Sequence, residues 1–360
     1  MVRIPSGCAI SGIISTKGIR FNGEAINRSI ACMHERSNGL GGGFVAYGIY
    51  PEYRDLYALH LMYETPQARG ETEEYLHKHF TVHQAELIPT GNATGIGEAP
   101  ALWRYFVRPE RKETENGPVR DNDDYVTASV MTINSRIHGA FVFSSGRNMG
   151  VFKGVGYPED IARFFRLEEY EGYMWVAHGR FPTNTPGWWG GAHPLGVLDW
   201  SVVHNGEVSS YGINKRYLEM FAYRLELQTD TEVIAYLFDL LHRRHGVPLD
   251  LVCRTLTAPF WKDIDRGDER EREVYTALRR VYGSAMLNGP FSVIVAFNGT
   301  MIGLNDRIKL RPMVCGRKDH FTLMGSEESA LREVAGDLDE VWHIRAGERF
   351  IARLEEGVTV

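Results

Sequence analysis

The first residue that could carry covalent chemistry is Cys8, which lies close to the start of the chain. The residues just before it, Pro5-Ser6-Gly7, are small or turn-forming. If residues 1–7 were removed, Cys8 would carry both a thiol and a free α-amine, and an unperturbed α-amine titrates at about 7.7–8.0, near the ideal for a general base at neutral pH. One residue would then supply a nucleophile and its base. Taken alone, the same cysteine also fits the buried core of a strand.

A second candidate is the pair Asn205-Gly206 in the segment WSVVHNGE, residues 200–207. Both residue types tolerate positive φ, so the pair fits a type I′ hairpin turn. The same pair could form an oxyanion hole, with the Asn205 side-chain amide and the Gly206 backbone N–H as donors. Each donor of this kind is worth roughly 3–4 kcal/mol of barrier. This segment alone leaves both interpretations open.

Two further segments offer groups that could hold a charged substrate. Arg180, in HGRFPTNT at residues 178–185, could pair bidentately with a carboxylate or form a structural salt bridge. The segment TDTE at residues 229–232 fits a capping box at the start of a helix. If Asp230 does not engage in capping, its carboxylate could instead hold a substrate ammonium group.

The remaining histidines and cysteines predict neither a metal site nor a disulfide framework. Three histidines surround the loop between these segments: His178, His193 and His204. No carboxylate or cysteine recurs at ligand spacing beside them, so we expect no metal in this chain. The other cysteines form no CxxC pair, and we expect small buried hydrophobic positions for all three: Cys32, Cys253 and Cys315.

Taken together and in this order, the segments resemble the class II glutamine amidotransferases, which belong to the N-terminal-nucleophile hydrolases. CAISGI at residues 8–13 resembles the start of the mature enzymes, and the family's glutaminase motifs are matched in chain order by HGRFPTNT, AHP at 192–194, VHNGE and TDTE. HERS at 34–37, NDRIKLRP at 305–312 and GSEE at 325–328 also fit. The resemblance spans nearly the whole chain.

For catalysis, the resemblance implies that Cys8 is the nucleophile and that its own α-amine is the base. Residues 1–7 would then be a leader that is cleaved, because the amine is otherwise held in a peptide bond. Asn205 and Gly206 would form the oxyanion hole. Attack of the thiolate on the side-chain amide of L-glutamine would release ammonia and leave a glutamyl thioester, which water would hydrolyse to glutamate.

For substrate binding, the resemblance implies that Arg180 holds the α-carboxylate of glutamine, with Thr183 nearby. It implies that Asp230 holds the α-ammonium group. Glutamine offers an amide, an anion and a cation, so each of its polar groups would have a partner in this set of residues.

Three features point to one branch of the family: the long stretch between Cys8 and Arg180, the opening PSGCAISGI and the segment SNGLGGGF. They resemble the stand-alone amidotransferase subunit of archaeal-type, split glutamate synthase. The sequence shows no glycine-rich phosphate loop, no acidic phosphoribosyl-diphosphate motif and no cysteine cluster for an iron–sulfur centre. We therefore expect no cofactor in this chain. By resemblance, a partner synthase subunit would hold FMN and iron–sulfur clusters and use the ammonia to make glutamate from 2-oxoglutarate.

Three alternatives stay open from the sequence. The ammonia acceptor could belong to another enzyme, such as N-methylglutamate synthase. The chain could be a non-catalytic regulatory subunit that binds glutamine without turnover. It could also be a hydrolase of the same fold that acts on another amide, although the pairing of Arg180 with Asp230 favours a free α-amino acid.

Composition excludes several broad classes of protein. The 360 residues include 40 basic and 46 acidic side chains, and 43% are hydrophobic, which is typical of globular proteins. The near-balanced charge gives no general reason to bind nucleic acid or an anionic membrane. The longest apolar runs, such as residues 291–297, are far shorter than the roughly 20 residues of a spanning helix, and no secretory signal precedes Cys8. We expect a soluble, cytoplasmic protein with neither of these partners.

The hydrophobic pattern predicts strands at both ends of the chain and a helical block between them. Apolar or alternating segments predict strands over 8–14, 44–50, 56–62, 126–133, 139–144, 173–177, 200–203, 291–297, 300–304, 320–324, 341–344 and 348–353. Helical spacing extends over 24–33, 71–79 and about 214–282, and the polar stretch 109–124 is expected to be a surface loop.

This distribution predicts a single α+β domain over residues 8–360, since no two-domain linker is evident. The family resemblance implies that this domain carries an insertion at about 66–150, because the arginine motif follows the cysteine much more closely in the shortest members. The family resemblance implies a four-layer αββα sandwich of two antiparallel sheets, of the N-terminal-nucleophile hydrolase type.

Overall fold

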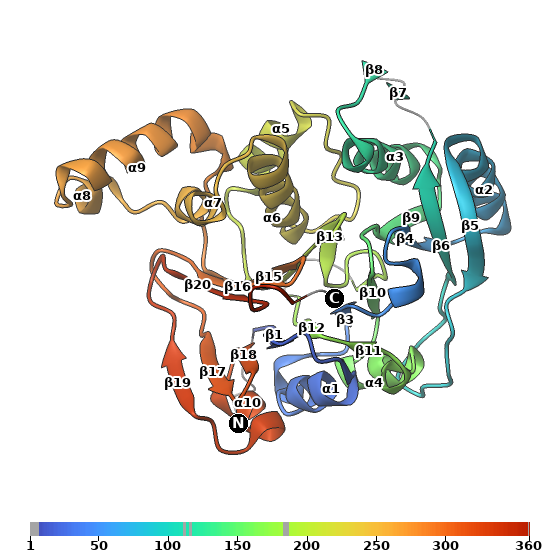
Figure 1. Cartoon of the computed structure of the whole chain (residues 1–360), viewed down its shortest axis with the longest axis horizontal. Coiled ribbons are helices and arrows are strands. Elements are labelled where there is room, and N and C mark those ends of the chain that lie inside the picture. The colour runs from blue at the N-terminus through green and yellow to red at the C-terminus, as the bar shows by residue number, and fades with distance from the viewer. Residues whose placement is uncertain (1–6, 111–112, 115–116, 183–186, 359) are drawn as a thin grey trace.

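Two antiparallel β-sheets pack face to face at the centre of the computed structural model, and helices cover their outer faces (Figure 1). The structure describes residues 7–110, 113–114, 117–182, 187–358 and 360. The fold is therefore the predicted α+β class, with the four layers in the order α, β, β, α. Among the described residues, no helix combines the length and the apolar character needed to cross a membrane.

The first sheet has seven strands in the order β10-β3-β12-β1-β18-β17-β19. Their bounds are β1 Ala9–Ser15, β3 Gly42–Tyr47, β10 Met149–Gly154, β12 Met174–Gly179, β17 Val314–Lys318, β18 Phe321–Gly325 and β19 Glu340–His343. Three helices cover its outer face: α1 Glu24–Ala31, α4 Pro158–Phe164 and α10 Glu328–Ala335. The first strand of the chain thus lies in the middle of this sheet.

The second sheet has five strands in the order β13-β14-β15-β16-β20. Their bounds are β13 Leu195–Val197, β14 Trp200–Gly206, β15 Phe291–Phe297, β16 Thr300–Asn305 and β20 Arg349–Arg353. Helix α6, Thr231–Phe238, packs on β13 and β14, and a π-helical turn at Asp239–Arg244 continues it. The remaining helices of this side are α5 Tyr211–Glu219, α7 Leu249–Leu256, α8 Trp261–Ile264 and α9 Glu269–Tyr282.

A third, four-stranded sheet lies to one side of the sandwich, at the right of Figure 1, in the order β5-β6-β4-β9. Its elements are β4 Tyr57–Tyr63, α2 Pro66–His79, β5 Phe80–Leu87, β6 Ala101–Pro109, α3 Asn122–Arg136 and β9 Ala140–Ser144. These residues overlap the predicted insertion. The short strands of the described chain pair as β2 Phe21–Asn22 with β11 Glu171–Gly172, and β7 Glu113–Thr114 with β8 Gly117–Pro118.

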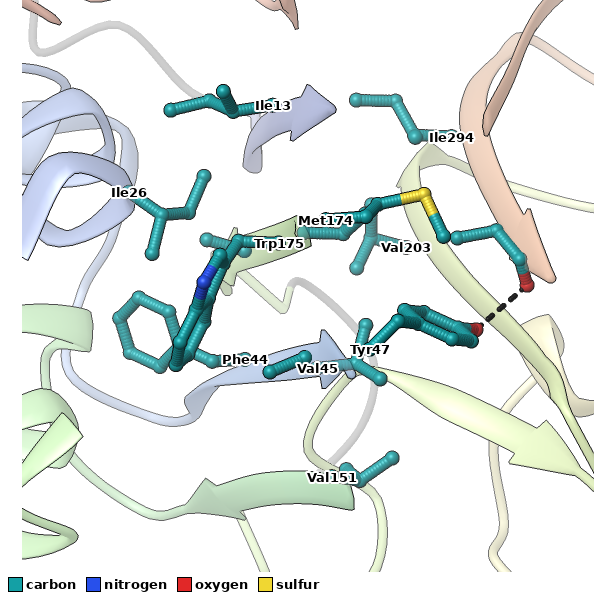
Figure 2. Close-up of a cluster of buried hydrophobic side chains, with 14 of the residues drawn as sticks. Ile13, Ile26, Phe44, Val45, Tyr47, Val151, Met174, Trp175, Val203 and Ile294 are labelled. Atoms are coloured by element: carbon teal, nitrogen blue, oxygen red, sulfur yellow. Dashed lines mark hydrogen bonds between the residues drawn. The ribbon is translucent and has the colours of Figure 1, made fainter. Parts of the chain in front are cut away.

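The main core lies between the two large sheets, where strands such as β1 (AISGIIS) are buried along their whole length. Near-continuous apolar runs are expected where a strand is covered on both faces. Figure 2 shows Tyr47 among these side chains; its hydroxyl lies 2.7 Å from Ser201 Oγ and 2.8 Å from the Ala296 carbonyl oxygen of the facing sheet. At Gly12 the sheets approach so closely that an added Cβ would lie 2.7 Å from Met301 Sδ.

Three predictions about local structure are wrong. Residues 126–133 form part of helix α3 and not a strand, and the expected surface loop over 109–124 ends earlier because α3 begins at Asn122. Six of the eight residues from 126 to 133 are buried, so the helix lacks the polar face that gives a helical period. Cys32, expected to be buried, ends α1 and is exposed, whereas Cys253 and Cys315 are buried as predicted.

Candidate active site

A cavity of about 490 Å³ opens at one end of the sandwich, where β1 begins and where β12 and β14 end. Four of the six residues singled out in the sequence line this cavity: Cys8, Arg180, Gly206 and Asp230. Asn205 lines an adjoining space of about 60 Å³, together with Cys8 and Gly206. Thr183 lies outside the described residues. Segments from four distant parts of the chain therefore meet at one site.

Strand pairing brings Cys8 and Arg180 together. Strands β1 and β12 are antiparallel neighbours with Ala9 opposite Gly179, so the residue before β1 and the residue after β12 lie side by side. The Phe181 backbone N–H donates to Cys8 Sγ over 3.3 Å. Arg36 Nε donates to the Cys8 carbonyl oxygen over 3.4 Å. The thiol and the guanidinium thus reach the cavity from adjacent strands.

The surroundings of Cys8 favour a neutral thiol. Burial raises the pKa of this thiol above its ordinary value, and the negative charge of Asp230 acts in the same direction. The Phe181 N–H and the positive charges of Arg180 and Arg311 oppose the rise, without reversing it. A nucleophilic role for Cys8 therefore requires a nearby base to accept the thiol proton.

The hairpin-turn interpretation of Asn205-Gly206 is wrong, because both residues continue β14. Asn205 pairs with Ser292 of β15, and Gly206 pairs with Phe291. Gly206 has a φ of +142°, and an added Cβ would lie 1.9 Å from the Pro290 carbonyl oxygen, so this position requires glycine.

The side chain of Asn205 is fully buried, and neither atom of its amide has a hydrogen-bond partner among the described residues. A buried amide without partners is costly in a folded protein, and its presence calls for an explanation. Its position beside Cys8 gives one: a ligand in this space would supply the missing partner.

Arg180 and Asp230 place opposite charges at the same cavity. Burial lowers the pKa of Arg180, while the Cys8 and Asp230 charges oppose that change. Asp230 occupies the N-cap position of α6, but its side chain makes no capping hydrogen bond. Its Oδ2 accepts instead from the Val208 N–H over 2.7 Å, and its side chain is 24% exposed.

The capping-box interpretation of residues 229–232 is therefore wrong for its two acidic residues. Glu232 does not reach back to the N-cap; it accepts from the Leu227 N–H over 3.1 Å and from the Tyr236 hydroxyl over 2.8 Å. Burial raises the pKa of Glu232 to about 7. Asp230 therefore lines the cavity, whereas Glu232 holds the backbone of the preceding loop at Leu227.

Three buried histidines are hydrogen-bonded at the cavity, and two of them, His193 and His204, line it. His193 Nδ1 lies 2.9 Å from His178 Nε2, which lies 3.0 Å from the His204 carbonyl oxygen. His204 Nδ1 in turn lies 3.0 Å from Thr231 Oγ1. Burial lowers the pKa of each imidazole, that of His178 to about 3, so these three side chains are uncharged at neutral pH. Within the described part of the chain, no three histidine, cysteine or carboxylate side chains are grouped to hold a metal.

Several groups at the site had no role assigned from the sequence. Arg311 lines the small space beside Cys8, and Lys153 is buried near the cavity with its Nζ donating to the Gly190 carbonyl oxygen over 2.8 Å. Burial lowers the pKa of Lys153 to about 7. Arg311 belongs to a segment already noted for its resemblance, NDRIKLRP, but only the three-dimensional arrangement places it beside Cys8.

The sequence profile of the family described as "Glutamine amidotransferases class-II" matches residues 98–360. The match covers more than half of the chain, which belongs to this family. It begins after Cys8, so the interpretation of Cys8 depends on its place in the cavity and on its resemblance to the family's nucleophile.

One relative extends over nearly the whole chain. It is a protein of Archaeoglobus fulgidus, named "Uncharacterized protein", that is 52% identical over 97% of this chain and 92% of its own length. A "Glutamine amidotransferase-like protein GlxB" of Rhizobium meliloti is 27% identical over 53% of this chain and 54% of its own length. An "Amidophosphoribosyltransferase" of Methanocaldococcus jannaschii is 24% identical over 60% of this chain. The match spans 42% of that enzyme's length.

Among solved structures, glutamine phosphoribosylpyrophosphate amidotransferase from B. subtilis aligns with a TM-score of 0.45 and 14% sequence identity. The alignment covers 97% of this chain and 50% of that chain.

Proposed function

We propose that this chain is a glutaminase subunit that hydrolyses L-glutamine to glutamate and ammonia through a thioester on Cys8. One observation carries the proposal: the nucleophile candidate, a cation and an anion line a single cavity in a chain of the class II glutamine amidotransferase family. A substrate cavity with a few convergent polar groups is the usual form of a small-molecule site.

In this proposal, substrate binding uses the two charges. Arg180 pairs with the α-carboxylate of glutamine, for which the planar guanidinium can offer two parallel hydrogen bonds. Asp230 pairs with the α-ammonium group through the oxygen lone pairs that Val208 does not use. Thr183 is expected to assist Arg180. The two contacts would fix the amino-acid end of glutamine and direct its side-chain amide toward Cys8.

In the proposed reaction, Cys8 Sγ attacks the amide carbon and the thiol proton moves to the base. The Asn205 side-chain amide and the Gly206 N–H donate to the developing oxyanion. The C–N bond then breaks, and the nitrogen leaves as ammonia after receiving the proton from the base. Water attacks the resulting thioester, which gives glutamate and restores the thiol.

The base in this proposal is the α-amine of Cys8, which exists only if residues 1–7 are removed. In the structure, Gly7 precedes Cys8 and the nitrogen of Cys8 is part of a peptide bond. We therefore propose that maturation at this bond precedes turnover. A raised thiol pKa supports this step, because Cys8 needs a base within reach.

We further propose that the ammonia passes to a glutamate synthase subunit that holds FMN and iron–sulfur clusters. The resemblance of the opening segment and of SNGLGGGF to the split glutamate synthases supports this partner. Co-purification from the source organism tests it: a flavoprotein with iron–sulfur absorbance is expected in the complex. A partner that amidates another acceptor would contradict the glutamate synthase role and leave the glutaminase role intact.

The glutaminase proposal is tested by ammonia release from L-glutamine, together with the intact mass of the protein. Protein that has lost residues 1–7 should release ammonia, and Cys8→Ser should release none. Cys32→Ser should match the wild type because Cys32 is exposed and is not one of the residues that line the cavity. Activity in Cys8→Ser would contradict the proposed nucleophile. A full-length mass with glutamine binding and no turnover, even with the partner present, would indicate a non-catalytic subunit.

A further inference from the structure

Arg311 lies against the N-terminal side of Cys8. It follows β16 in sequence and lines the small space of about 60 Å³ together with Cys8, Asn205 and Gly206. Its Nη1 lies 3.1 Å from the position that a Cβ would take at Gly7, the residue bonded to Cys8. The guanidinium is therefore in the immediate surroundings of the nucleophile candidate and was not assigned a role from the sequence.

The loop that carries Arg311 is held by one buried carboxylate. Asp306 accepts backbone N–H groups of Ile308 over 2.7 Å, Lys309 over 2.9 Å and Leu310 over 3.2 Å. It also accepts from the Phe291 N–H at the start of β15 over 3.1 Å. Three of these bonds hold the turn at residues 306–310, and the fourth ties that turn to β15, the strand that pairs with Asn205 and Gly206. The loop that leads to Arg311 is therefore attached next to the site.

The charge of Arg311 is not paired within the described part of the chain. Its Nε is buried and has no hydrogen-bond partner there, and no described carboxylate forms an ion pair with it. The other charged groups around Cys8 are Arg180 at the end of β12, Glu207 directly after β14, Asp230 before α6, and Arg36, which bonds to the Cys8 carbonyl oxygen and pairs with Glu327. The uncharged His204 lies on β14.

We propose that Arg311 is a positioning residue for the reaction at Cys8: its unpaired positive charge favours the thiolate over the thiol. The inference deepens the proposed glutaminase function and rests on it, since it names the basic group that prepares that nucleophile. A cation near a thiol favours the charged form. Burial works against the thiolate here, and Arg311 is one of two arginines that offset it.

The inference is tested by the rate at which iodoacetamide alkylates Cys8 between pH 6 and pH 10.5, followed by peptide mass spectrometry so that the exposed Cys32 is counted separately. In Arg311→Gln we expect the midpoint of the profile to rise by about one pH unit, with an about tenfold slower reaction at pH 7.5. Arg311→Lys should keep the wild-type midpoint because it keeps the charge. Lys309→Gln removes a positive charge from the same loop and should leave the profile unchanged.

An unchanged midpoint in Arg311→Gln would overturn the inference, and so would an equal shift in Lys309→Gln or a full shift in Arg311→Lys. If circular dichroism shows that Arg311→Gln is unfolded, Arg311→Met provides the neutral variant with an unbranched stem. Alkylation needs no glutamine, so the inference and the proposed function can fail separately. A shifted alkylation midpoint in Arg311→Gln, in a protein whose wild type releases no ammonia, would contradict the proposed function and leave the inference intact. Normal ammonia release by the wild type with no shifted midpoint in Arg311→Gln would contradict the inference and leave the proposed function intact.

Discussion

Asp230→Asn should impair glutamine hydrolysis while making Cys8 more reactive, two effects of opposite sign from one substitution. Asparagine has the shape of aspartate, and its Oδ1 can accept the Val208 N–H that Asp230 Oδ2 accepts at 2.7 Å. The fold should therefore be preserved. What is lost is the negative charge at the cavity, which is the proposed partner of the α-ammonium group of glutamine.

The size of the first effect follows from the contact that is lost. A hydrogen bond to a charged group is worth about 1.5–3 kcal/mol, and the Asp230 side chain is only 24% exposed, so solvent screens it little. At 1.4 kcal/mol per factor of ten, kcat/KM for glutamine should fall by about 10- to 150-fold, mainly through KM. The second effect has the opposite sign because Asp230 raises the pKa of the Cys8 thiol, and its neutral replacement should speed alkylation at pH 7.5.

The assay compares glutamine with glutaramate, the same side-chain amide without the α-amine. The wild type should prefer glutamine, and Asp230→Asn should lose most of that preference while its rate on glutaramate stays near that of the wild type. Asp265→Asn, an exposed aspartate outside the cavity lining, serves as the matched control and should change neither reaction. An equal loss on both substrates, an unchanged KM for glutamine or slower alkylation of Cys8 would refute the reasoning.

Three further substitutions test other parts of the structure. Asn205→Ala should lower kcat by about 10²- to 10³-fold in steady-state ammonia release, and an unchanged kcat would contradict an oxyanion role. The thermal midpoint should stay unchanged, since the buried amide makes no hydrogen bond to the described residues. Gly206→Ala should destabilise the fold by more than about 1 kcal/mol in urea titrations, because its Cβ would overlap the Pro290 carbonyl; a wild-type midpoint would contradict this. Burial lowers the pKa of His60 to about 3, whereas a histidine in the unfolded chain has a pKa of about 6.5. Below about pH 6.5 the unfolded chain therefore binds a proton that the folded protein does not, and His60 lowers the free energy of unfolding by about 1.4 kcal/mol per pH unit. His60→Gln should remove that part of the slope between pH 6.5 and pH 5, and an identical slope would show that His60 does not cause it.

Strands that are buried on both faces could be predicted from the sequence because their apolar runs are short and bounded. The run FSVIVAF coincides with β15, Phe291–Phe297. The run at 126–133, VTASVMTI, mixes apolar and small hydroxyl residues as a strand can, yet it belongs to α3, where most of its residues are buried. Periodicity cannot separate these two cases, because burial removes the polar positions that would mark the period. Strand β17, Val314–Lys318, was missed because its second half is polar and partly exposed.

The site residues could be proposed from their order in the chain, but their geometry could not. Asn205-Gly206 has the sequence of a turn, and only pairing with β15, some 90 residues later, keeps it extended. Asp230 has the sequence of a helix cap, and only the neighbouring Val208 N–H turns its carboxylate away from the helix. Both outcomes depend on contacts between residues distant in sequence, which no local pattern contains.

The placement of β1 is consistent with the proposed role of Cys8, because it brings the start of this strand to the cavity. Strand β1 pairs with β12 on one side and β18 on the other, so the chain enters the middle of the first sheet directly from the cavity. Gly7, the residue before Cys8, lines the small space beside the cavity. Gly7 has a φ of +139°, and Arg311 Nη1 lies 3.1 Å from where its Cβ would be. Few residues other than glycine could adopt this backbone conformation. A Gly7→Val variant should therefore strain the backbone next to Cys8 and also displace the Arg311 guanidinium.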